Sequence, residues 1–487
     1  MAASPAPFGS HIPFTLVLFG ASGHLAKQKL YPALYTLALK KRLPAQYAIV
    51  GFARSAMDDG GFRTLVEGAV RADMPEVTER ALADFLTHVH YVRGAYDAPA
   101  DFAALEKHLT SLENGWEEHV RLAYLSVPPT IFPPVLQNLC KAGIPHGTGV
   151  SGFRCIVEKP LGHDQKSGEA IWRDLVACFG EESVYLLDHY LGKEAVRNVY
   201  YLRHANPVLE RIFKNTLIEH VEITASEAHG LEGRAGYFEE TGTLRDFVQS
   251  HLLQIAALLT MRLQEGDSFR TSRLNALEQF YLPHASSLDD VIVQGQYGAG
   301  KILGDHAPGY REESGVRPDS RTNTYIALKL LTRISRWEGV PFYLRTGKRL
   351  PAKETRVSIL FQEPKHIGEG STSNRLDIIL QGEAGMRLFL QTKLGGTEPR
   401  FRPLVMADPL VCVGDCLPEH GMLLLEAIHG RTSWYLSIDE VRAAWRLVDP
   451  LQAHLDRPET PLHSYPAGHH PDAAEEWMKK EGRRWME

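Results

Sequence analysis

Residues 14–26, FTLVLFGASGHLA, constrain the fold of this chain more than any other segment. A run of six apolar residues ends abruptly at Gly20, and Gly23 follows before a pattern typical of a helix begins. A buried parallel strand that turns into a helix through glycines is the usual form of a dinucleotide site, because the turn brings backbone amides to the pyrophosphate. The spacing is G-x-x-G-x-x-A rather than G-x-G-x-x-G, so on this segment alone an ordinary strand-turn-helix corner is an equal alternative.

Length and composition predict two domains and argue against several classes of protein. A chain of 487 residues is too long for one hydrophobic core, and 44% hydrophobic residues suffice for two. The net charge of -6 contains no block of like charges, which argues against nucleic-acid binding and against binding to a membrane surface. The N-terminus lacks the basic start of a secretion signal, and no apolar stretch is long enough to span a bilayer. We therefore expect a cytoplasmic protein.

The cysteines indicate a reducing compartment. Their number, five, is odd in a long chain, which argues against a disulfide framework and for a reducing compartment. Cys412 and Cys416 have no cysteine or histidine partners at zinc-binding spacing. We expect buried or partly buried thiols at this pair, and no metal site.

The sequence pattern changes close to residue 187. Before it, short apolar runs alternate with longer amphipathic segments, which is typical of a parallel sheet with crossover helices. After it, helical segments precede period-two patterns, which predict antiparallel, half-exposed strands. These strands are expected at residues 356–362, 375–381 and 386–392. We expect a dinucleotide-binding domain at 1–187, a second domain at 188–487, and a surface extension after Pro458.

Arg54 follows the second predicted strand, where an NAD site usually has an acidic residue that binds the ribose 2'-hydroxyl. A guanidinium at this position favours the 2'-phosphate of NADP+, because it pairs with phosphate through a planar fork. The alternative is a solvated surface arginine. Asp58 and Asp59 follow within a few residues and leave some use of NAD+ open.

Lys159 lies at the end of another predicted strand, in the sequence Glu158-Lys159-Pro160. The preceding strand ends in Pro128-Pro129, which forces an extended turn. Open α/β sheets bind ligands at this carboxyl edge. Lys159 is therefore a candidate to reach a cofactor or substrate oxygen, although most lysines are solvated surface charges.

Residues 186–194, LLDHYLGKE, place Asp188, His189, Tyr190 and Lys193 at a predicted strand-to-helix junction. His189 and Lys193 are four residues apart, so they would share a helical face and could hold a phosphate dianion there. The alternative is that Asp188 caps the helix and its neighbours are solvated.

His251 lies on the apolar side of a helix predicted at 243–259. A lone histidine on such a face is more often a core residue than a catalyst. A carboxylate supplied by Asp188 would reverse that judgement, because it would hold one ring nitrogen and leave the other as a base near neutral pH.

Residues 341–354, PFYLRTGKRLPAKE, carry four cations around a Gly/Pro turn, at Arg345, Lys348, Arg349 and Lys353. Such a cluster could bind an anionic substrate or form a plain basic loop. Composition does not choose between the two.

Taken together, these segments resemble the glucose-6-phosphate dehydrogenase family in its shorter bacterial form. The family's motifs occur in order along nearly the whole chain. They read GASGHLAKQKLYPAL, GFARS, AYLSVPPT, EKPLG, DHYLGKE, EGRAGYFEE, RDFVQSHLLQ and LRTGKRLPAK. The resemblance implies an α/β Rossmann-type domain followed by a β+α domain with a large, mostly antiparallel sheet. It also implies oxidation of D-glucose 6-phosphate at C1 to 6-phospho-D-glucono-1,5-lactone by NADP+, in the oxidative pentose phosphate or Entner-Doudoroff route.

The resemblance assigns roles to residues by motif. Asp188 and His251 would be the catalytic dyad, with His251 taking the proton of the C1 hydroxyl. The residues implied in substrate binding are His189, Tyr190, Lys193, Glu227, Asp246, Lys348, Lys353 and Lys159, the last lying between cofactor and sugar. The residues implied in cofactor binding are Gly20, Ala21, Ser22, Gly23, His24, Leu25, Ala26, Lys27, Arg54, Tyr124 and Lys159.

The chain departs from the family pattern at two motifs. His24 replaces the usual aspartate of GASGDLAK, which removes a negative charge beside the nucleotide phosphates, and EKPLG replaces EKPFG, a mild hydrophobic exchange. The resemblance suggests a homodimer or homotetramer formed through the second domain's sheet. Two other interpretations are a Rossmann dehydrogenase of another sugar, against which DHYLGKE and HLLQ weigh, and a catalytically inactive nucleotide sensor. The presence of Asp188, Lys193 and His251 argues against the sensor.

Overall fold

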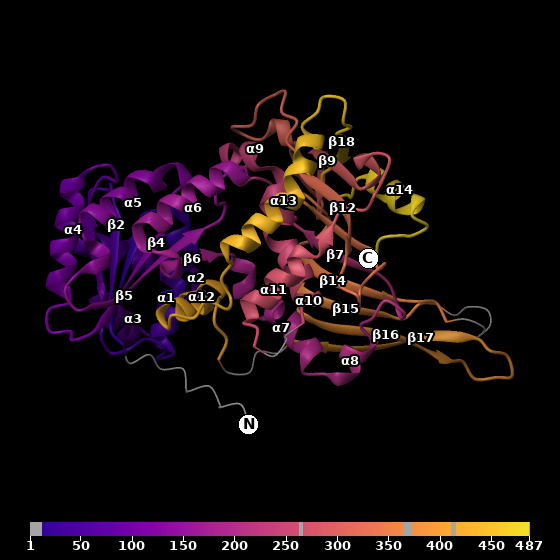
Figure 1. Cartoon of the computed structure of the whole chain (residues 1–487), viewed down its shortest axis with the longest axis horizontal. Helices are drawn as coiled ribbons and strands as arrows, with labels where there is room; N and C mark the ends of the chain where they lie inside the picture. Colours follow the sequence, from indigo (N-terminus) through magenta and orange to yellow (C-terminus); the bar gives the residue numbers. More distant parts are fainter. Residues whose placement is uncertain (1–11, 263–265, 365–371, 411–414, 487) are drawn as a thin grey trace. The chain divides into compact units, whose positions relative to one another are not determined.

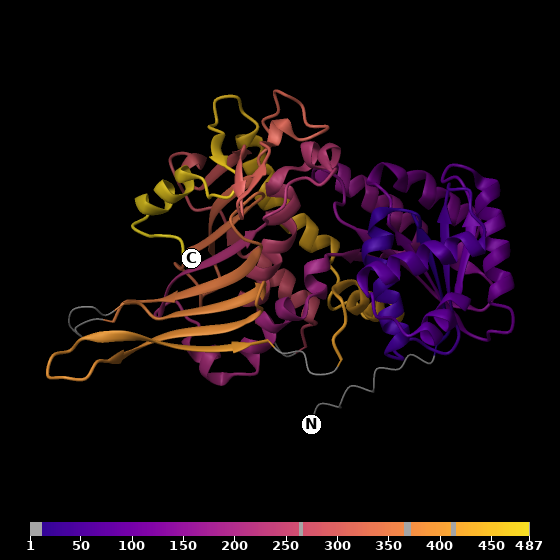
Figure 2. The ribbon, with the colours of Figure 1, turned by 180° about the vertical axis from the view of Figure 1, so that it is seen from behind.

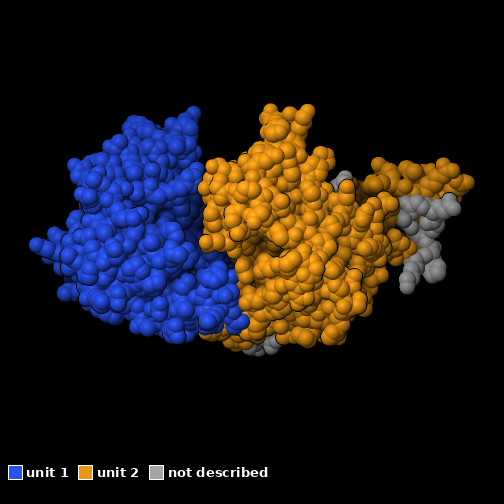
Figure 3. Space-filling view, turned by 90° about the horizontal axis from the view of Figure 1, so that it is seen from above, with its two compact units in different colours: residues 1–193, 413–438 blue, residues 194–412, 439–487 orange. Residues whose placement is uncertain are grey.

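The computed structural model describes residues 12–262, 266–364, 372–410 and 415–486 (Figure 1). The chain divides into two compact units, which Figure 3 colours separately. The first unit comprises residues 1–193 and 413–438, and the second comprises residues 194–412 and 439–487. Each unit is built around its own sheet.

The first unit contains a six-stranded parallel sheet with the order β3-β2-β1-β4-β5-β6. Its strands are β1 (Phe14–Phe19), β2 (Tyr47–Ala53), β3 (Val89–Arg93), β4 (His119–Leu125), β5 (Val150–Glu158) and β6 (Val184–Leu187). Every residue of β1, β2 and β4 is buried, as expected for parallel strands covered on both faces. The strand order reverses between β1 and β4, which is where Rossmann folds bind their ligands. The predicted Rossmann-type fold is confirmed.

Helices and short turns connect these strands. The helices are α1 (Tyr31–Leu39), α2 (Asp59–Asp73), α3 (Glu79–Thr87), α4 (Pro99–Leu112), α5 (Phe132–Lys141), α6 (Gln165–Phe179) and α12 (Glu419–Ile428), with the π-helix η1 (Ala26–Leu30) before α1. The 3-10 turns are η2 (Pro129–Ile131), η3 (Ile144–His146), η4 (Glu181–Ser183) and η5 (His189–Gly192). Asp164 begins α6 with a capping box, in which its side chain accepts from the Ser167 amide at 2.7 Å. The helix α12 joins this unit from far along the chain.

Two cysteines of the first unit are bonded. Cys140 at the end of α5 and Cys178 at the end of α6 form a disulfide, with their Cα atoms 5.8 Å apart. The argument against disulfides is therefore wrong for this pair, because α5 and α6 pack side by side, which linear spacing does not reveal. Cys155 is free and buried, and burial raises the pKa of its thiol. The expectation for Cys412 and Cys416 involves Cys412, which lies outside the described residues.

The second unit contains a ten-stranded, mostly antiparallel sheet (Figure 2). Its order is β17-β16-β15-β14-β7-β13-β12-β9-β18, with β8 paired to β12, and only the β13-β7 and β18-β9 pairs are parallel. The strands are β7 (Ile218–Ser226), β8 (Phe280–Tyr281), β9 (Ile292–Gly298), β12 (Tyr325–Thr332), β13 (Phe342–Gly347), β14 (Glu354–Phe361), β15 (Arg375–Gln381), β16 (Gly385–Lys393), β17 (Phe401–Pro409) and β18 (His463–Pro466). A separate hairpin joins β10 (Gly300–Ile302) to β11 (Asp305–Ala307). The predicted large antiparallel sheet is confirmed.

The helices of the second unit include a buried ion pair. They are α7 (Glu194–His204), α8 (Pro207–Ile212), α9 (Ala235–Thr243), the π-helix η6 (Leu244–Leu252), α10 (Leu253–Thr260), α11 (Phe269–Glu278), α13 (Ile438–Leu455) and α14 (Asp472–Lys480), with 3-10 turns η7 (Leu288–Asp290) and η8 (Tyr310–Glu312). Arg273 of α11 and Glu440 of α13 are fully buried and pair at 2.5 Å. Each charge compensates the other, so removing one partner would leave an unpaired buried charge. None of the helices within the described ranges is long and apolar enough to cross a bilayer.

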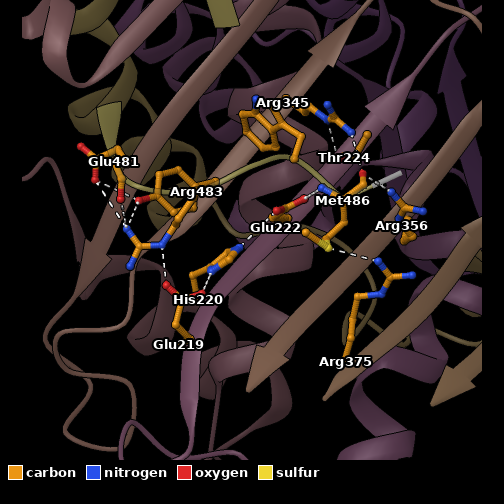
Figure 4. Close-up of polar contacts among 12 residues, drawn as sticks. Glu219, His220, Glu222, Thr224, Arg345, Arg356, Arg375, Glu481, Arg483 and Met486 are labelled. Atoms are coloured by element: carbon orange, nitrogen blue, oxygen red, sulfur yellow. Dashed lines mark hydrogen bonds and ion pairs between the residues drawn. The ribbon is translucent and has the colours of Figure 1, made fainter. Parts of the chain in front are cut away.

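The C-terminal segment covers the sheet rather than extending from the surface. The backbone carbonyl of Met486 accepts from Arg345 at 3.0 Å and from Arg356 at 2.6 Å, and its amide donates to Glu222 at 3.0 Å (Figure 4). The predicted surface extension is therefore wrong. The same covering corrects the expectation of half-exposed strands at 356–362 and 375–381, because β14 and β15 are buried along almost their whole length. The expectation is confirmed for 386–392, because β16 is half-exposed along most of its length. Charged residues of this face can be buried because the C-terminal segment pairs with them.

A second polar cluster lies beside this segment on the same sheet. His220 is buried between the carboxylates of Glu219 and Glu222, and Glu219 also accepts from Arg483 at 2.6 Å (Figure 4). Burial alone would lower the pKa of His220, but its hydrogen bonds to the two carboxylates outweigh burial and raise it. The cluster therefore binds the end of the chain to β7 through charge.

Candidate active site

The turn after β1 has the backbone that a dinucleotide requires. Gly20 has φ of +81°, and a Cβ there would lie 2.2 Å from the carbonyl oxygen of Ser126, so only glycine fits. The Gly23 amide donates to the Gly20 carbonyl at 2.8 Å and closes the turn. A helical segment follows directly, which leaves free amides at the carboxyl edge of the sheet.

The other predicted residues of this turn divide into packed and accessible ones. Ala21 and Ala26 are buried, and the Ala21 carbonyl accepts from the Tyr31 hydroxyl at 2.6 Å. His24 and Lys27 are exposed, whereas Ser22, Gly23 and Leu25 are half-buried. The helix that begins here opens as a π-helix, which the sequence pattern did not indicate.

Arg54 is exposed just after β2, near the glycine turn. The next residue, Ser55, shares a hydrogen bond of 3.0 Å with Ser22 of that turn. The Arg54 guanidinium lies 5.9 Å from the centre of the Tyr96 ring, within reach of a cation-π contact. The structure thus brings Arg54 and the glycine turn together at one edge of the sheet.

The two acidic residues that left NAD+ use open both have structural partners. Asp58 caps α2, where its side chain accepts from the Gly61 amide at 2.8 Å. Asp59 accepts from the Tyr91 amide at 2.7 Å. Their carboxylates therefore hold α2 and β3 in place.

Tyr124 and Glu158, the residue before Lys159, form a partly buried pair. The Tyr124 hydroxyl donates to Oε1 of Glu158 at 2.5 Å. Burial first, and then Glu158, raise the pKa of Tyr124 well above its ordinary value. Tyr124 is fully buried, whereas Lys159 is half-buried and precedes a cis peptide bond to Pro160.

The LLDHYLGKE segment folds differently from the sequence expectation. Asp188 caps the short turn η5, where its Oδ1 accepts from the Tyr190 amide at 2.9 Å. Lys193 ends that turn in an extended conformation, and α7 begins only at Glu194. The predicted shared helical face of His189 and Lys193 is therefore wrong. Instead, the Lys193 Nζ lies 3.6 Å from the centre of the Tyr190 ring.

In the second unit, Asp246 and His251 lie on η6. Residues five apart lie about 140° apart around an α-helix, but the i to i+5 bonds of a π-helix place them nearly one above the other. His251 is buried, and its ring meets the Phe247 ring edge-on at 5.3 Å between centres. The predicted position of His251 on the apolar side of the helix is confirmed.

Lys348 and Asp246 share a recess of the second unit. Lys348 is buried, donates to Glu227 at 2.5 Å, and lies 5.0 Å from the centre of the Phe238 ring. The Tyr237 hydroxyl donates to Asp246 at 3.2 Å, and burial, followed by Asp246, raises the pKa of Tyr237. The recess is lined by Leu231, Arg234, Tyr237, Phe238, Asp246 and Lys348.

The four cations of residues 341–354 do not form one cluster. Among them, Lys348 alone lines the recess, while Arg345 binds the C-terminal segment and Arg349 pairs with Glu313 at 3.4 Å. Lys353 is exposed just before β14. The side chains diverge because the strand β13 ends at Gly347, between Arg345 and the others.

Asn323 supports η6 and was missed by the sequence interpretation. Its Oδ1 accepts from the Thr243 amide at 2.9 Å, and its backbone carbonyl accepts from the Thr243 hydroxyl at 3.1 Å. These bonds satisfy groups at the start of the helix that carries Asp246 and His251. A lone asparagine far along the chain gave no signal of this contact.

The glycine turn at the reversal point of a parallel sheet, together with a second sheet domain carrying a buried histidine and carboxylates, defines a two-domain nicotinamide-dependent dehydrogenase. The profile of "Glucose-6-phosphate dehydrogenase, NAD binding domain" matches residues 17–198, and that of "Glucose-6-phosphate dehydrogenase, C-terminal domain" matches residues 200–486. The chain belongs to the glucose-6-phosphate dehydrogenase family.

Relatives with an assigned name are similar in sequence to this chain over almost its whole length. A glucose-6-phosphate 1-dehydrogenase of Chlamydia pneumoniae is 36% identical over 493 residues, covering 97% of this chain and 96% of the relative. One of Bacillus subtilis is 32% identical over 482 residues, covering 96% and 97%. A solved structure described as glucose-6-phosphate dehydrogenase in complex with its substrate glucose-6-phosphate has a TM-score of 0.87 at 30% identity, covering 97% of this chain and 98% of that chain.

Proposed function

We propose that this protein oxidises D-glucose 6-phosphate at C1 to 6-phospho-D-glucono-1,5-lactone and passes the hydride to NADP+. The observation that carries the proposal is family membership along 97% of the chain, with Asp188, His189, Lys193 and His251 all present in their motifs. The reaction belongs to the oxidative branch of glucose 6-phosphate metabolism in the cytoplasm.

His251 acts as the general base of the proposed reaction. A neutral ring nitrogen accepts the proton of the C1 hydroxyl while the hydride leaves C1, so charge does not accumulate on the sugar. Asp188 holds the other ring nitrogen, fixes the tautomer and stabilises the imidazolium that forms. The cofactor, when bound, supplies the hydride acceptor.

Two groups of residues bind the sugar phosphate. His189 and Lys193 bind the phosphate dianion, and Lys193 approaches it from a position over the Tyr190 ring. Glu227, Asp246, Lys348 and Lys353 bind the sugar. The Lys348 ion pair with Glu227 supports this assignment, because it fixes a carboxylate and an ammonium in one orientation before the substrate arrives.

The glycine turn and Arg54 select the cofactor in this proposal. Residues 20–27 provide backbone groups for the pyrophosphate, and Arg54 binds the 2'-phosphate of NADP+. Lys159, which directly follows the Glu158 that Tyr124 contacts, binds cofactor and sugar. The structural use of Asp58 and Asp59 supports a preference for NADP+ over NAD+.

The first experiment follows reduced nicotinamide by its ultraviolet absorbance. The purified protein is supplied with NADP+ and, in separate reactions, with glucose 6-phosphate, glucose, and other hexose phosphates. We expect NADP+ to be reduced rapidly in the reaction that contains glucose 6-phosphate and not in the others. Turnover of a different sugar with higher kcat/KM would support the dehydrogenase of another sugar, and no reduction with any sugar would support the inactive sensor.

Replacing Arg54 with alanine should lower kcat/KM for NADP+ about tenfold and leave that for NAD+ nearly unchanged. An exposed charge-assisted contact to phosphate is at the weak end of the range for such bonds, which sets this magnitude. The measurement is kcat/KM for both cofactors at saturating glucose 6-phosphate, with Arg80→Ala as the control at another exposed arginine. An unchanged ratio between cofactors would remove Arg54 from 2'-phosphate recognition.

The protein is further proposed to self-associate through the free edge of the second sheet. β17 pairs with β16 on one side, and no strand pairs with its other side among the described residues. Leu404 and Met406 are 42% and 49% exposed and point to the same face of the strand. An exposed apolar edge strand invites pairing with another chain, and the hairpin of β16 and β17 reaches out from the rest of its sheet (Figure 1).

Introducing lysine at Leu404 and Met406 should convert the assembly to monomers. Charges on an edge strand oppose pairing, because each would be desolvated in the interface. Light scattering during gel filtration should give a multiple of the monomer mass for the wild type and the monomer mass for the double variant. An unchanged mass in the double variant would place the interface elsewhere.

A further inference from the structure

The first turn of α12 contacts three segments of its own unit that carry or adjoin predicted site residues. Glu419 pairs with Lys29 of η1, with 3.3 Å between Oε1 and Nζ. Its backbone carbonyl lies so close to Gly192 that a Cβ there would be 2.3 Å away. Burial disfavours the Glu419 carboxylate, but nearby charges led by Lys29 outweigh it and lower its pKa. This turn is therefore packed against the segments after β1 and β6, and His420 extends the contact to the last residue of β5.

His420 is buried between Glu158 and His189. Its Nε2 lies 3.5 Å from Oε1 of Glu158, the same oxygen that accepts from Tyr124. Its ring is nearly parallel to that of His189, with an interplanar angle of 10° and 6.2 Å between centres. Glu158 directly precedes Lys159 in the chain. One imidazole therefore contacts a predicted substrate ligand, His189, and the residue that precedes another, Lys159, at the ends of different strands.

We propose that His420 is a positioning residue for the dehydrogenase reaction, a role that rests on the proposed function. Its Nε2 side holds Glu158, and thereby the backbone at Lys159. Its ring face holds the imidazole of His189. Small displacements of such ligands are costly, because a misplacement of about 1 Å can reduce the rate about 100-fold. His420 makes this contribution without touching sugar or cofactor.

Three substitutions separate the two contacts. His420→Gln retains a donor that can reach Glu158 but loses the ring, so the KM for glucose 6-phosphate should rise while kcat stays close to the wild type. His420→Phe retains the ring but loses the donor, so kcat should fall while KM changes little. His420→Ala loses both, and its kcat/KM should fall about tenfold. Binding of glucose 6-phosphate without cofactor, measured by calorimetry, should weaken in the Gln and Ala variants only.

The control is His429→Ala, at the other end of the same helix. Thermal unfolding of each variant shows whether α12 remains packed. The positioning role is refuted if the His420 variants match His429→Ala in kcat and KM, or if Gln and Phe produce the same change. If the Ala variant fails to fold, the opposite patterns of Gln and Phe decide the matter. A wild-type protein without activity on glucose 6-phosphate refutes the proposed function itself, whereas an active wild type with unaffected His420 variants refutes only the positioning role.

Discussion

Replacement of His251 by asparagine should lower kcat about 10³- to 10⁴-fold, with little change in the affinity for glucose 6-phosphate. Asparagine keeps a similar polar volume but has no nitrogen that accepts a proton, so the C1 hydroxyl would lose its base at the moment of hydride transfer. The variant should still bind glucose 6-phosphate, because other residues are assigned to its phosphate and its hydroxyl groups. Steady-state kcat and a calorimetric dissociation constant for the sugar phosphate measure the two effects separately.

The control for this variant is His454→Asn. His454 is also a largely buried histidine of the second unit, and its Nε2 lies 2.8 Å from Oδ1 of Asp289. Its replacement disturbs the fold to a comparable degree without entering the proposed chemistry, so its kcat should stay near the wild type. A His251→Asn protein with nearly normal kcat would remove His251 from the mechanism.

Strands were predictable where a continuous apolar run or a regular alternation marked them. Residues 375–381 were expected as a strand and form β15 over the same range, and residues 14–19 form β1 as expected. The exposure of β15 was less predictable. β15 alternates like a half-exposed strand, but α7 packs against it and its charged residues are paired, so both faces are buried.

Helix type and long-range packing were beyond the reach of the sequence pattern. The segment that carries His251 reads as an amphipathic helix in either the α or the π form, because apolar residues at three- and four-residue spacing fit both. Asp188 caps a short 3-10 turn that ends before Lys193, so His189 and Lys193 do not lie on one helix as expected. Contacts such as Cys140 with Cys178, or His420 with Glu158, depend on which helices and strands pack together, and local spacing carries no information about that.

Replacement of Lys193 by alanine should weaken the affinity for glucose 6-phosphate about 10- to 100-fold and change kcat far less. Hydrogen bonds to a charged group contribute about 1.5–3 kcal/mol, which corresponds to this range. The ammonium group lies over the Tyr190 ring, so the unbound protein already holds it in place and little entropy is lost when the phosphate binds. Dissociation constants and kcat/KM are measured for glucose 6-phosphate and for glucose, since glucose lacks the group that Lys193 is assigned to bind.

The comparison between the two sugars makes the Lys193 prediction specific to the phosphate. A general distortion of the site would weaken the binding of glucose and of glucose 6-phosphate equally. Loss of a phosphate ligand instead weakens only the binding of glucose 6-phosphate, and so reduces the discrimination between the two sugars. Lys166→Ala, at an exposed lysine of α6, controls for the loss of one positive charge from the same unit. If the Lys193 variant still discriminates between the two sugars as the wild type does, the phosphate must be held by other groups, and the role assigned to the DHYLGKE segment is wrong.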